Sequence, residues 1–409
     1  MKLSTWKTLL SLVSITTLTS AQLTGKVGPT TSTASKQATI CNVLNYGGSV
    51  GSSVRYRTCN GSAFTNCVLK HKGSTLYVPP GNYGMQTWQT LTGASQWALQ
   101  MDGVITREST TGGHMIVVEN ANDFEFFSSN SAGAIQGNGY QCRNAGPRLI
   151  RIITSTNWSL HDLILVDSPE FHLIVQEGSN GEVYNLAIRG TNLGGSDGVD
   201  ISGVNHWVHD VEVTNRDECV TIKSPASNIL VERIWCNQSG GSAIGSMGAG
   251  TAIENILYRN VYTNGGNQIF MIKSWGGDGY LRNVLLQNFI ARGTAYGLDV
   301  NQYWSGQTQV AGNGVQINNV TFQNWSATNK ATNKCESSFG TGSCLRGGTP
   351  TSFAVTTTSI GMPSGFTNPP SLSGDLSQGF ATNSPIPIPT IPTTFYPGLP
   401  QISPLAKNK

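Results

Sequence analysis

One pattern recurs along the middle of the sequence: a turn residue, an alternating apolar stretch and another turn. The matching position in successive units falls at Asp162, Asn185, Asp210, Arg233, Asn260, Asn288 and Asn324. The steps between these positions are 23, 25, 23, 27, 28 and 36 residues. Apolar residues alternate within each unit, which predicts strands and not helices. A strand-based period in the twenties predicts a solenoid with one coil per unit.

A single coil cannot bury its inward side chains, so neighbouring coils must stack with their strands about 4.8 Å apart. The inward Val, Ile and Leu residues then form the core, and the recurring asparagines suit the tight bends between strands. A leucine-rich repeat has a similar period, but its leucine consensus is absent. A β-sandwich would not give so regular a step. We therefore expect an all-β fold, a right-handed parallel β-helix.

The two ends of the chain differ from the repeats. Lys2 and Lys7 precede an apolar run at 9–18 and small residues up to Ala21, which predicts a secretory signal peptide over 1–21. A retained anchor is the alternative, but the run is too short to span a bilayer, and no later segment has about 20 consecutive apolar residues. We expect the solenoid over 22–348. Residues 349–409, rich in Thr, Ser and Pro, form either a disordered or O-glycosylated stalk or a strip along the solenoid.

Cysteines and glycosylation signals point to an oxidising compartment. The chain has 8 cysteines without a paired CxxC element, which favours disulfides over a zinc site. Asn-x-Ser/Thr sequons occur at Asn60, Asn157, Asn237, Asn319 and Asn324. The net charge of +3 includes the two leader lysines, so the mature chain is nearly neutral. We expect a secreted, extracellular, monomeric glycoprotein with no nucleic-acid or membrane partner.

Acidic residues gather in two Gly- or Asn-containing turns. Asp197 and Asp200 lie in the first turn, and Asp217 and Glu218 lie 20 residues later, which is close to one coil. Adjacent coils would stack these carboxylates, and like charges raise one another's pKa, so one carboxyl group can stay protonated. Glycoside hydrolysis needs one carboxylic acid for the leaving oxygen and one carboxylate for water. The alternative is that these acids are solvated turn residues or Ca²⁺ ligands.

Four short segments carry a resemblance to a known family. They are Gly195-Ser196-Asp197-Gly198, Asp217-Glu218-Cys219, Gly240-Gly241-Ser242-Ala243-Ile244-Gly245-Ser246 and Met271-Ile272-Lys273. In order and spacing they resemble the motifs of glycoside hydrolase family 28, which contains polygalacturonases and rhamnogalacturonan hydrolases. The resemblance covers nearly the whole mature chain and implies a parallel β-helix.

The departures from the family pattern bear on the substrate. Polygalacturonases have aspartate, histidine and arginine where this chain has Glu218, Ser242 and Met271. The segments Asp217 to Ala226 and Ile272 to Ser274 instead resemble the rhamnogalacturonan hydrolase branch. That resemblance implies an acidic plant cell-wall polysaccharide, the galacturonate-rhamnose backbone of pectin, as substrate. A polygalacturonase is the alternative.

The resemblance also implies roles for individual residues. Asp217 would be the general acid, Asp197 and Glu218 would position and deprotonate water, and the anomeric centre would be inverted. Lys273 would bind a galacturonate carboxylate, unless it is an ordinary exposed lysine. His172 and Tyr296 would line the groove, or serve the fold. No metal or cofactor is implied.

The implied disulfides are Cys41–Cys67, Cys219–Cys236 and Cys335–Cys344, which leaves Cys59 and Cys142 over. Two stretches fit the family poorly. Residues 46–66 lack the acidic, helix-forming segment that caps the first coil, and the chain between Trp325 and Cys335 is about one coil short.

Two other functions are compatible with the fold. A pectate lyase would need Ca²⁺ and an arginine base, for which Arg189 and Arg216 are candidates, although no lyase motif surrounds them. A non-catalytic solenoid that binds the cell wall would retain the groove without the chemistry.

Overall fold

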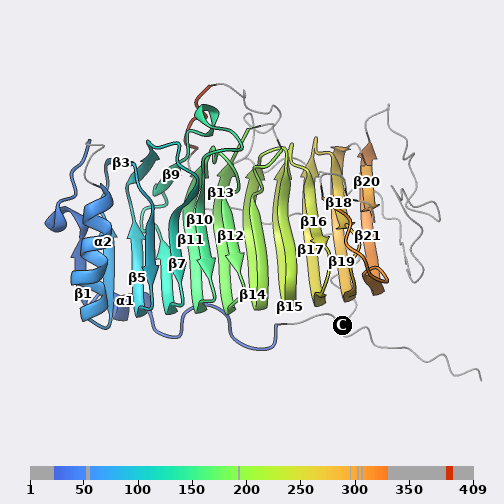
Figure 1. Ribbon diagram of the computed structural model, residues 1–409, viewed down its shortest axis with the longest axis horizontal. Coiled ribbons are helices and arrows are strands. Elements are labelled where there is room, and N and C mark those ends of the chain that lie inside the picture. The colour runs from blue at the N-terminus through green and yellow to red at the C-terminus, as the bar shows by residue number, and fades with distance from the viewer. Residues whose placement is uncertain are drawn as a thin grey trace, which may run out of the picture.

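The computed structural model describes residues 23–51, 56–191, 194–294, 296–301, 304, 307–329 and 384–389. These residues form successive coils whose strands pair in parallel within one 21-stranded sheet. The coils stack side by side along the long axis of the molecule (Figure 1). Parallel strands joined by right-handed crossovers make a right-handed parallel β-helix, as the repeat predicts.

The amino-terminal part of the chain contains the helices. Its elements are α1 (Thr33–Lys36), β1 (Thr39–Asn42), η1 (Val43–Tyr46), α2 (Tyr56–Asn66), η2 (Val68–Lys70), β2 (Ser74–Val78), β3 (Asn82–Met85), β4 (Gln89–Thr92), β5 (Ser95–Met101), β6 (Val104–Arg107), β7 (Gly113–Glu119), β8 (Asn122–Phe127), β9 (Ala134–Gln136) and η3 (Gly139–Gln141).

The remaining elements are strands, several of which turn a corner of the solenoid. They are β10 (Pro147–Ile153), β11 (Thr156–Val166), β12 (Leu173–Gln176), β13 (Ser179–Arg189), β14 (Val199–Thr214), β15 (Glu218–Asn237), β16 (Gly241–Met247), β17 (Thr251–Asn264), β18 (Gln268–Ser274), β19 (Gly279–Thr294), β20 (Tyr296–Asn301) and β21 (Gln316–Asn329).

The repeat positions lie in bends of left-handed backbone conformation. The φ angle is 56° at Asp162, 48° at Asn185 and 53° at Asp210. Asn and Asp tolerate this conformation better than other residues with a side chain. Neighbouring bends are also joined by side-chain hydrogen bonds, such as that from Asn185 Nδ2 to Asp162 Oδ1 (3.1 Å). The predicted role of the recurring asparagines is confirmed.

In-register pairing aligns one outward row of residues along the solenoid, which we call the front row. Paired residues of parallel strands point to the same face of the sheet, and here the flanking Val199 and Ile201 point into the core. The front row consists of Val117, Arg151, Ile174, Asp200, Thr221, Ala243, Met271 and Asp299.

A helix covers the amino-terminal end of the solenoid, although the sequence led us to expect no such cap within 46–66. The carboxyl half of α2 buries Ala63 and Phe64, and the Phe64 ring packs edge-on against Trp97 with 5.1 Å between centroids. The predicted disulfide Cys41–Cys67 joins β1 to the end of this helix. The helix forms without the acidic residues because tertiary packing, more than local propensity, stabilises helices.

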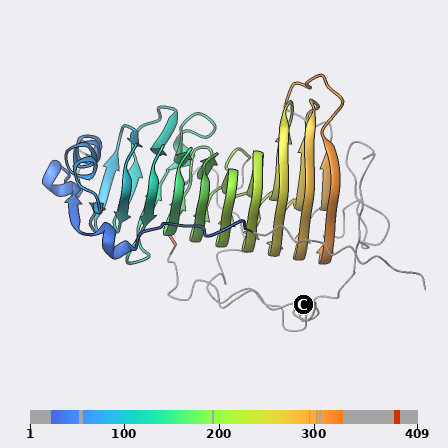
Figure 2. The same ribbon diagram turned by 90° about the horizontal axis from the view of Figure 1, so that it is seen from below.

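A strap and a strip run across the coils from the two ends of the chain. The N-terminal strap, residues 23–36, crosses several coils (dark blue in Figure 2). Its Thr24 and Gly28 amides donate to Asn205 Oδ1 (2.7 Å) and the Asn180 carbonyl (2.9 Å). The C-terminal strip, residues 384–389, buries Ile386, whose carbonyl accepts from Gln136 Nε2 (2.8 Å). For these six residues the strip alternative is confirmed.

Several other predictions fall outside the described residues. These are the signal peptide over 1–21, the disulfide Cys335–Cys344, the side chains of Cys59, Asn60 and Asn324, most of 325–335, and the rest of 349–409. Among the described cysteines, Cys142 carries a free thiol.

The remaining sequons differ in exposure. Asn237 is completely buried and its amide donates to Thr214 Oγ1 (3.3 Å), so this fold leaves no room for a glycan there. The amide nitrogens of Asn157 and Asn319 donate to Asn122 and Asn283 in the bends (3.0 and 2.9 Å). Of these three sites, Asn319 is the exposed one.

Candidate active site

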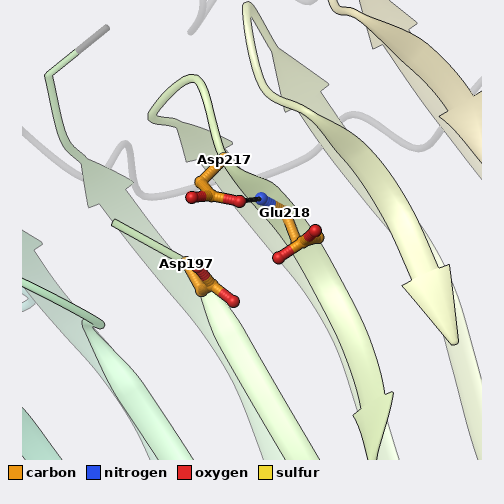
Figure 3. A group of neighbouring side chains, drawn as sticks. All are labelled: Asp197, Asp217 and Glu218. Carbon is orange, nitrogen blue, oxygen red and sulfur yellow. Dashed lines mark hydrogen bonds between the residues drawn. The ribbon is translucent and has the colours of Figure 1, made fainter. Parts of the chain in front are cut away.

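Two adjacent coils bring three acidic side chains together. Asp197 lies in the turn before β14, and Asp217 and Glu218 lie at the start of β15. One carboxylate oxygen from each residue lies within 4.8 Å of the others, as Figure 3 shows. The stacking of one coil on the next thus gathers the three acids that the sequence singled out.

Asp217 is held by backbone amides. Its Oδ1 accepts a hydrogen bond from the Glu218 amide (2.8 Å), and its Oδ2 accepts from the Gly195 amide. Burial, followed by repulsion from Glu218, nevertheless raises the pKa of Asp217 to about 7. This carboxyl group therefore holds its proton in mildly acidic solution, as a general acid must.

Glu218 differs from Asp217 in its protonation state. Burial acts to raise its pKa, but the ammonium group of Lys273, which donates directly to Oε1, lowers the pKa to about 2. The Lys273 side chain reaches Glu218 from β18, and Nζ lies 4.7 Å from the centroid of the Trp304 ring. Glu218 is thus an ionised carboxylate next to a protonated one.

Asp197 and Asp200 share a second lysine. Lys223 Nζ lies 3.4 Å from Asp200 Oδ2 and 4.0 Å from Asp197 Oδ2. Burial and repulsion from Asp200, Glu218 and Asp217 raise the pKa of Asp197 well above its usual value. Among the acids of the cluster, Glu218 is therefore the carboxylate that is ready to accept a proton.

The acidic cluster consists of carboxylate oxygens, which are the ligands that a divalent cation such as Ca²⁺ prefers. Two lysines stand close to it, however, and Lys273 already donates to Glu218. The ammonium groups supply the positive charge that keeps Glu218 ionised.

Of the two roles that the sequence left open for His172, its burial fits a role in the fold and not in the groove. His172 is completely buried, its Nδ1 lies 3.1 Å from the Asp197 carbonyl, and the Ser168 amide donates to its Nε2 (3.3 Å). Burial lowers the pKa of His172 to about 4, so the ring is neutral. The imidazole fixes the turn that carries Asp197, and its burial depends on how the coils stack.

Tyr296 begins β20, where its backbone pairs with Gln268 of β18, but its side chain lies outside the described part of the chain. Ser242 and Met271, which replace the histidine and arginine of polygalacturonases, are buried. The predicted disulfide Cys219–Cys236 joins the two ends of β15 across one coil, directly after the turn that carries Asp217.

Sequence reasoning gave no role to Lys223 or Trp304. Lys223 lies in a segment that resembles the family, but its pairing with Asp200 depends on the register between β14 and β15. Trp304 lies 31 residues after Lys273, and no motif connects the two.

A protonated carboxyl group beside an ionised one is the pair of groups that glycoside hydrolysis requires. Comparison with known proteins agrees. The model of the family described as "Glycosyl hydrolases family 28" matches residues 88–358. The chain belongs to this family.

Curated relatives match over nearly their whole length. Rhamnogalacturonase A of Aspergillus niger is 48% identical over 95% of this chain and 96% of its own. Rhamnogalacturonase A of Aspergillus aculeatus is 48% identical over 97% and 99%. The chain is a glycoside hydrolase.

Among solved structures, endo-xylogalacturonan hydrolase from Aspergillus tubingensis superposes with a TM-score of 0.64 at 20% identity, over 80% of this chain and 96% of that one. The exopolygalacturonase of Thermotoga maritima gives a TM-score of 0.57 at 16% identity, over 74% and 83%. At these identities the likeness concerns the fold. Within the described part of the chain, no helix has the length and apolar character needed to cross a bilayer.

Proposed function

We propose that this chain hydrolyses the bond between galacturonate and rhamnose in the backbone of rhamnogalacturonan. The proposal draws on the relatives named as rhamnogalacturonases and on the residues next to the acidic cluster. One observation carries the proposal. On β18 only Lys273 brings a positive charge to Glu218, and the front-row residue of the same strand is the apolar Met271.

The apolar neighbour suits a rhamnose on the leaving-group side. Rhamnose is a 6-deoxy sugar, so it presents a methyl group where galacturonate presents a carboxylate. Met271 is a flexible apolar side chain that adapts to such a group. An arginine at this position would favour a second carboxylate through bidentate hydrogen bonds.

In the proposed mechanism Asp217 protonates the glycosidic oxygen as the bond breaks. Glu218 accepts a proton from the attacking water, and Asp197 holds that water in place through its own hydrogen bond. A galacturonate carboxylate that draws Lys273 away from Glu218 would raise the pKa of Glu218, which makes it a stronger base once substrate is bound.

The stereochemical outcome rests on the family resemblance and not on the geometry. The carboxylate oxygens lie within 4.8 Å of one another. Inverting enzymes commonly separate acid and base by about 6.5–9.5 Å, to admit water as well as sugar. We propose inversion, and proton NMR of the freshly released reducing end tests it, because a product that retains the anomeric configuration contradicts it.

The decisive experiment compares two polymers. Purified protein is incubated with rhamnogalacturonan and with polygalacturonate, and the products are sized and their reducing ends identified. Release of fragments that end in galacturonate from rhamnogalacturonan alone supports the proposal, with Asp217→Asn as the inactive control. Release from polygalacturonate alone overturns the substrate assignment. No release from either polymer favours the non-catalytic solenoid.

A lyase is less compatible with the structure. Of its two candidate bases, Arg189 is buried in an ion pair with Glu212 (2.9 Å). Products of a lyase would be unsaturated and absorb in the ultraviolet, which the same digest detects.

We further propose that residues 1–21 are removed as a signal peptide and that the mature protein acts outside the cell as a monomer, with 22–348 as the catalytic solenoid. Intact mass measured on the protein secreted by its native host locates the cleavage site and counts the glycans.

A further inference from the structure

The front row continues beyond the acidic cluster toward the amino-terminal coils, where it carries a cation. Arg151 pairs with Ile174, and Ile174 pairs with Asp200. Arg151 therefore lies on the same face as Asp200 and two coils away, a distance of about 10 Å. Met271, which we place on the leaving-group side, lies in the opposite direction along the same row.

The contacts of Arg151 are with neutral groups. Nη1 lies 2.9 Å from His114 Nε2, and Nη2 donates to Gln176 Oε1. Nε is buried without a hydrogen-bond partner. Among the described residues, no carboxylate lies within 4.0 Å of this guanidinium group, and Glu119 attracts it only from farther away.

Six other arginines of the solenoid are paired with carboxylates, whereas Arg107 donates to neutral groups such as the Asn138 carbonyl and Gln141 Oε1. Arg143, Arg148, Arg189, Arg233, Arg259 and Arg282 each have a carboxylate within 4.0 Å. Arg148, the charged residue nearest in sequence, is neutralised by Glu170, and its guanidinium group lies 5.2 Å from the Phe171 ring centroid. Among the described residues, Arg151 thus has no ion-pair partner within 4.0 Å, and at this partly buried position it would attract an anion more strongly than a solvated arginine would.

His114 contacts the guanidinium group of Arg151 and carries no charge of its own. Burial, followed by repulsion from Arg151 and Arg148, lowers the pKa of His114 to about 4. The neutral ring can accept a hydrogen bond from Arg151 and so hold the guanidinium group in position.

We propose that Arg151, held by His114 and Gln176, binds a galacturonate carboxylate of the polysaccharide on the side of the cleavage point that does not leave. This inference deepens the proposed function and rests on it. The occupant is a sugar carboxylate, because the site lies on the face and in the row where the polymer must pass to reach Asp217. A planar guanidinium group suits a carboxylate through two parallel hydrogen bonds.

Binding to a catalytically inactive protein tests the site. In the Asp217→Asn background, calorimetry measures affinity for rhamnogalacturonan oligosaccharides and for the same oligosaccharides with their carboxyl groups reduced to alcohols. Arg151→Gln should weaken binding of the acidic form about tenfold, which is one lost charge-assisted contact. The same change should leave binding of the reduced form unaltered.

Two further variants serve as controls. Arg148→Gln removes a charge that Glu170 already compensates, so affinity should fall less than about twofold. Arg151→Lys keeps the charge without the planar fork and should recover part of the affinity. Thermal unfolding verifies that each variant is folded.

Equal losses for acidic and reduced oligosaccharides would show that Arg151 serves the fold, and unchanged affinity for both would show that it does not touch the polymer. Either result overturns the inference. Turnover of rhamnogalacturonan by the unmodified protein is measured in parallel. If turnover fails while binding still depends on Arg151, the proposed function is wrong and the binding site stands.

Discussion

Asp217 and Glu218 are adjacent in sequence and have the same charge when ionised, yet the fold drives their pKa values apart, to about 7 and about 2. The difference comes from the partner of each group. Asp217 is buried beside a carboxylate, whereas Glu218 accepts a hydrogen bond from the ammonium group of Lys273. A pair with pKa values on either side of a mildly acidic pH supplies the acid and the base at the same time.

The raised pKa of Asp217 has a consequence for stability. In the unfolded chain this group loses its proton near its ordinary pKa of 3.8, whereas in the folded protein it does so near 7. Between these values the unfolded state binds fewer protons than the folded state, so this group makes folding less favourable as pH rises. The loss is complete above about pH 7 and amounts to a few kcal/mol, since each tenfold change in affinity is about 1.4 kcal/mol.

Asp217→Asn should therefore abolish turnover and stabilise the fold at neutral pH. The amide oxygen of asparagine can still accept from the Gly195 amide, and asparagine cannot ionise. We expect a gain of roughly 2–4 kcal/mol in the free energy of unfolding at pH 7 and almost none at pH 4. Guanidinium unfolding at both pH values measures the difference. An equal effect at pH 4 and pH 7 would contradict the pKa assignment.

The acidic residues were predictable from the sequence, and some of their partners were not. Asp197 and Asp217 are separated by nearly one coil, so the repeat length alone places them side by side. The pairing of Lys223 with Asp200 depends on strand register, and the burial of His172 depends on how a turn closes over it. These contacts are set by tertiary packing, which leaves no local signal.

At the scale of the strand, the bends hold the repeats in register. Asn180 near the start of β13 has a φ of 56°, donates through Nδ2 to Asn157 Oδ1 (2.9 Å) and accepts from Asn205 Nδ2 (2.8 Å). One residue thus meets two demands: a left-handed backbone and two amide hydrogen bonds. The recurrence of asparagine made these bends predictable because few other residues meet both demands.

Two substitutions at Asn180 separate those demands. Asn180→Gly loses the amide hydrogen bonds but adopts the backbone freely, and we expect a loss of about 1–2 kcal/mol in unfolding free energy. Asn180→Ala also strains the backbone and should lose about 1–2 kcal/mol more. Alanine is ordinarily the more favourable of the two residues, so the reversed order identifies the bend.

Denaturant unfolding of both variants tests this order. Asn318→Ala is the matched control, because Asn318 is an exposed strand residue without positive φ, and we expect a change below about 0.5 kcal/mol. A glycine variant that is less stable than the alanine variant would refute the account.

At the scale of the whole molecule, a solenoid has open ends and interacts mainly between neighbouring coils. This chain covers its amino-terminal end with α2 and the Cys41–Cys67 disulfide. The sequence did not predict this helix, because tertiary packing such as that of Phe64 against Trp97 stabilises it and leaves no local signal. The N-terminal strap and the C-terminal strip then join coils that are not neighbours, so separate coils unfold together more readily than in a bare repeat array.

The C-terminal strip offers a direct test of that long-range role. Ile386 is 2% exposed among Ala134, Ile164, Val166 and Ala187, whereas Ile388, two residues later, is 38% exposed. Ile386→Ala should lower the free energy of unfolding by about 2–4 kcal/mol, since it deletes a buried side chain. Ile388→Ala changes the same residue type in the same segment and should cost less than about 1 kcal/mol.

Thermal and guanidinium unfolding of the two variants give the comparison. Turnover at low temperature should be the same for both, because none of the core residues around Ile386 belongs to the acidic cluster. Equal stability of the two variants would mean that the strip is not bound in solution. A large loss confined to Ile386→Ala would show that residues more than 200 positions apart in the sequence, such as Gln136 and Ile386, stabilise the solenoid together.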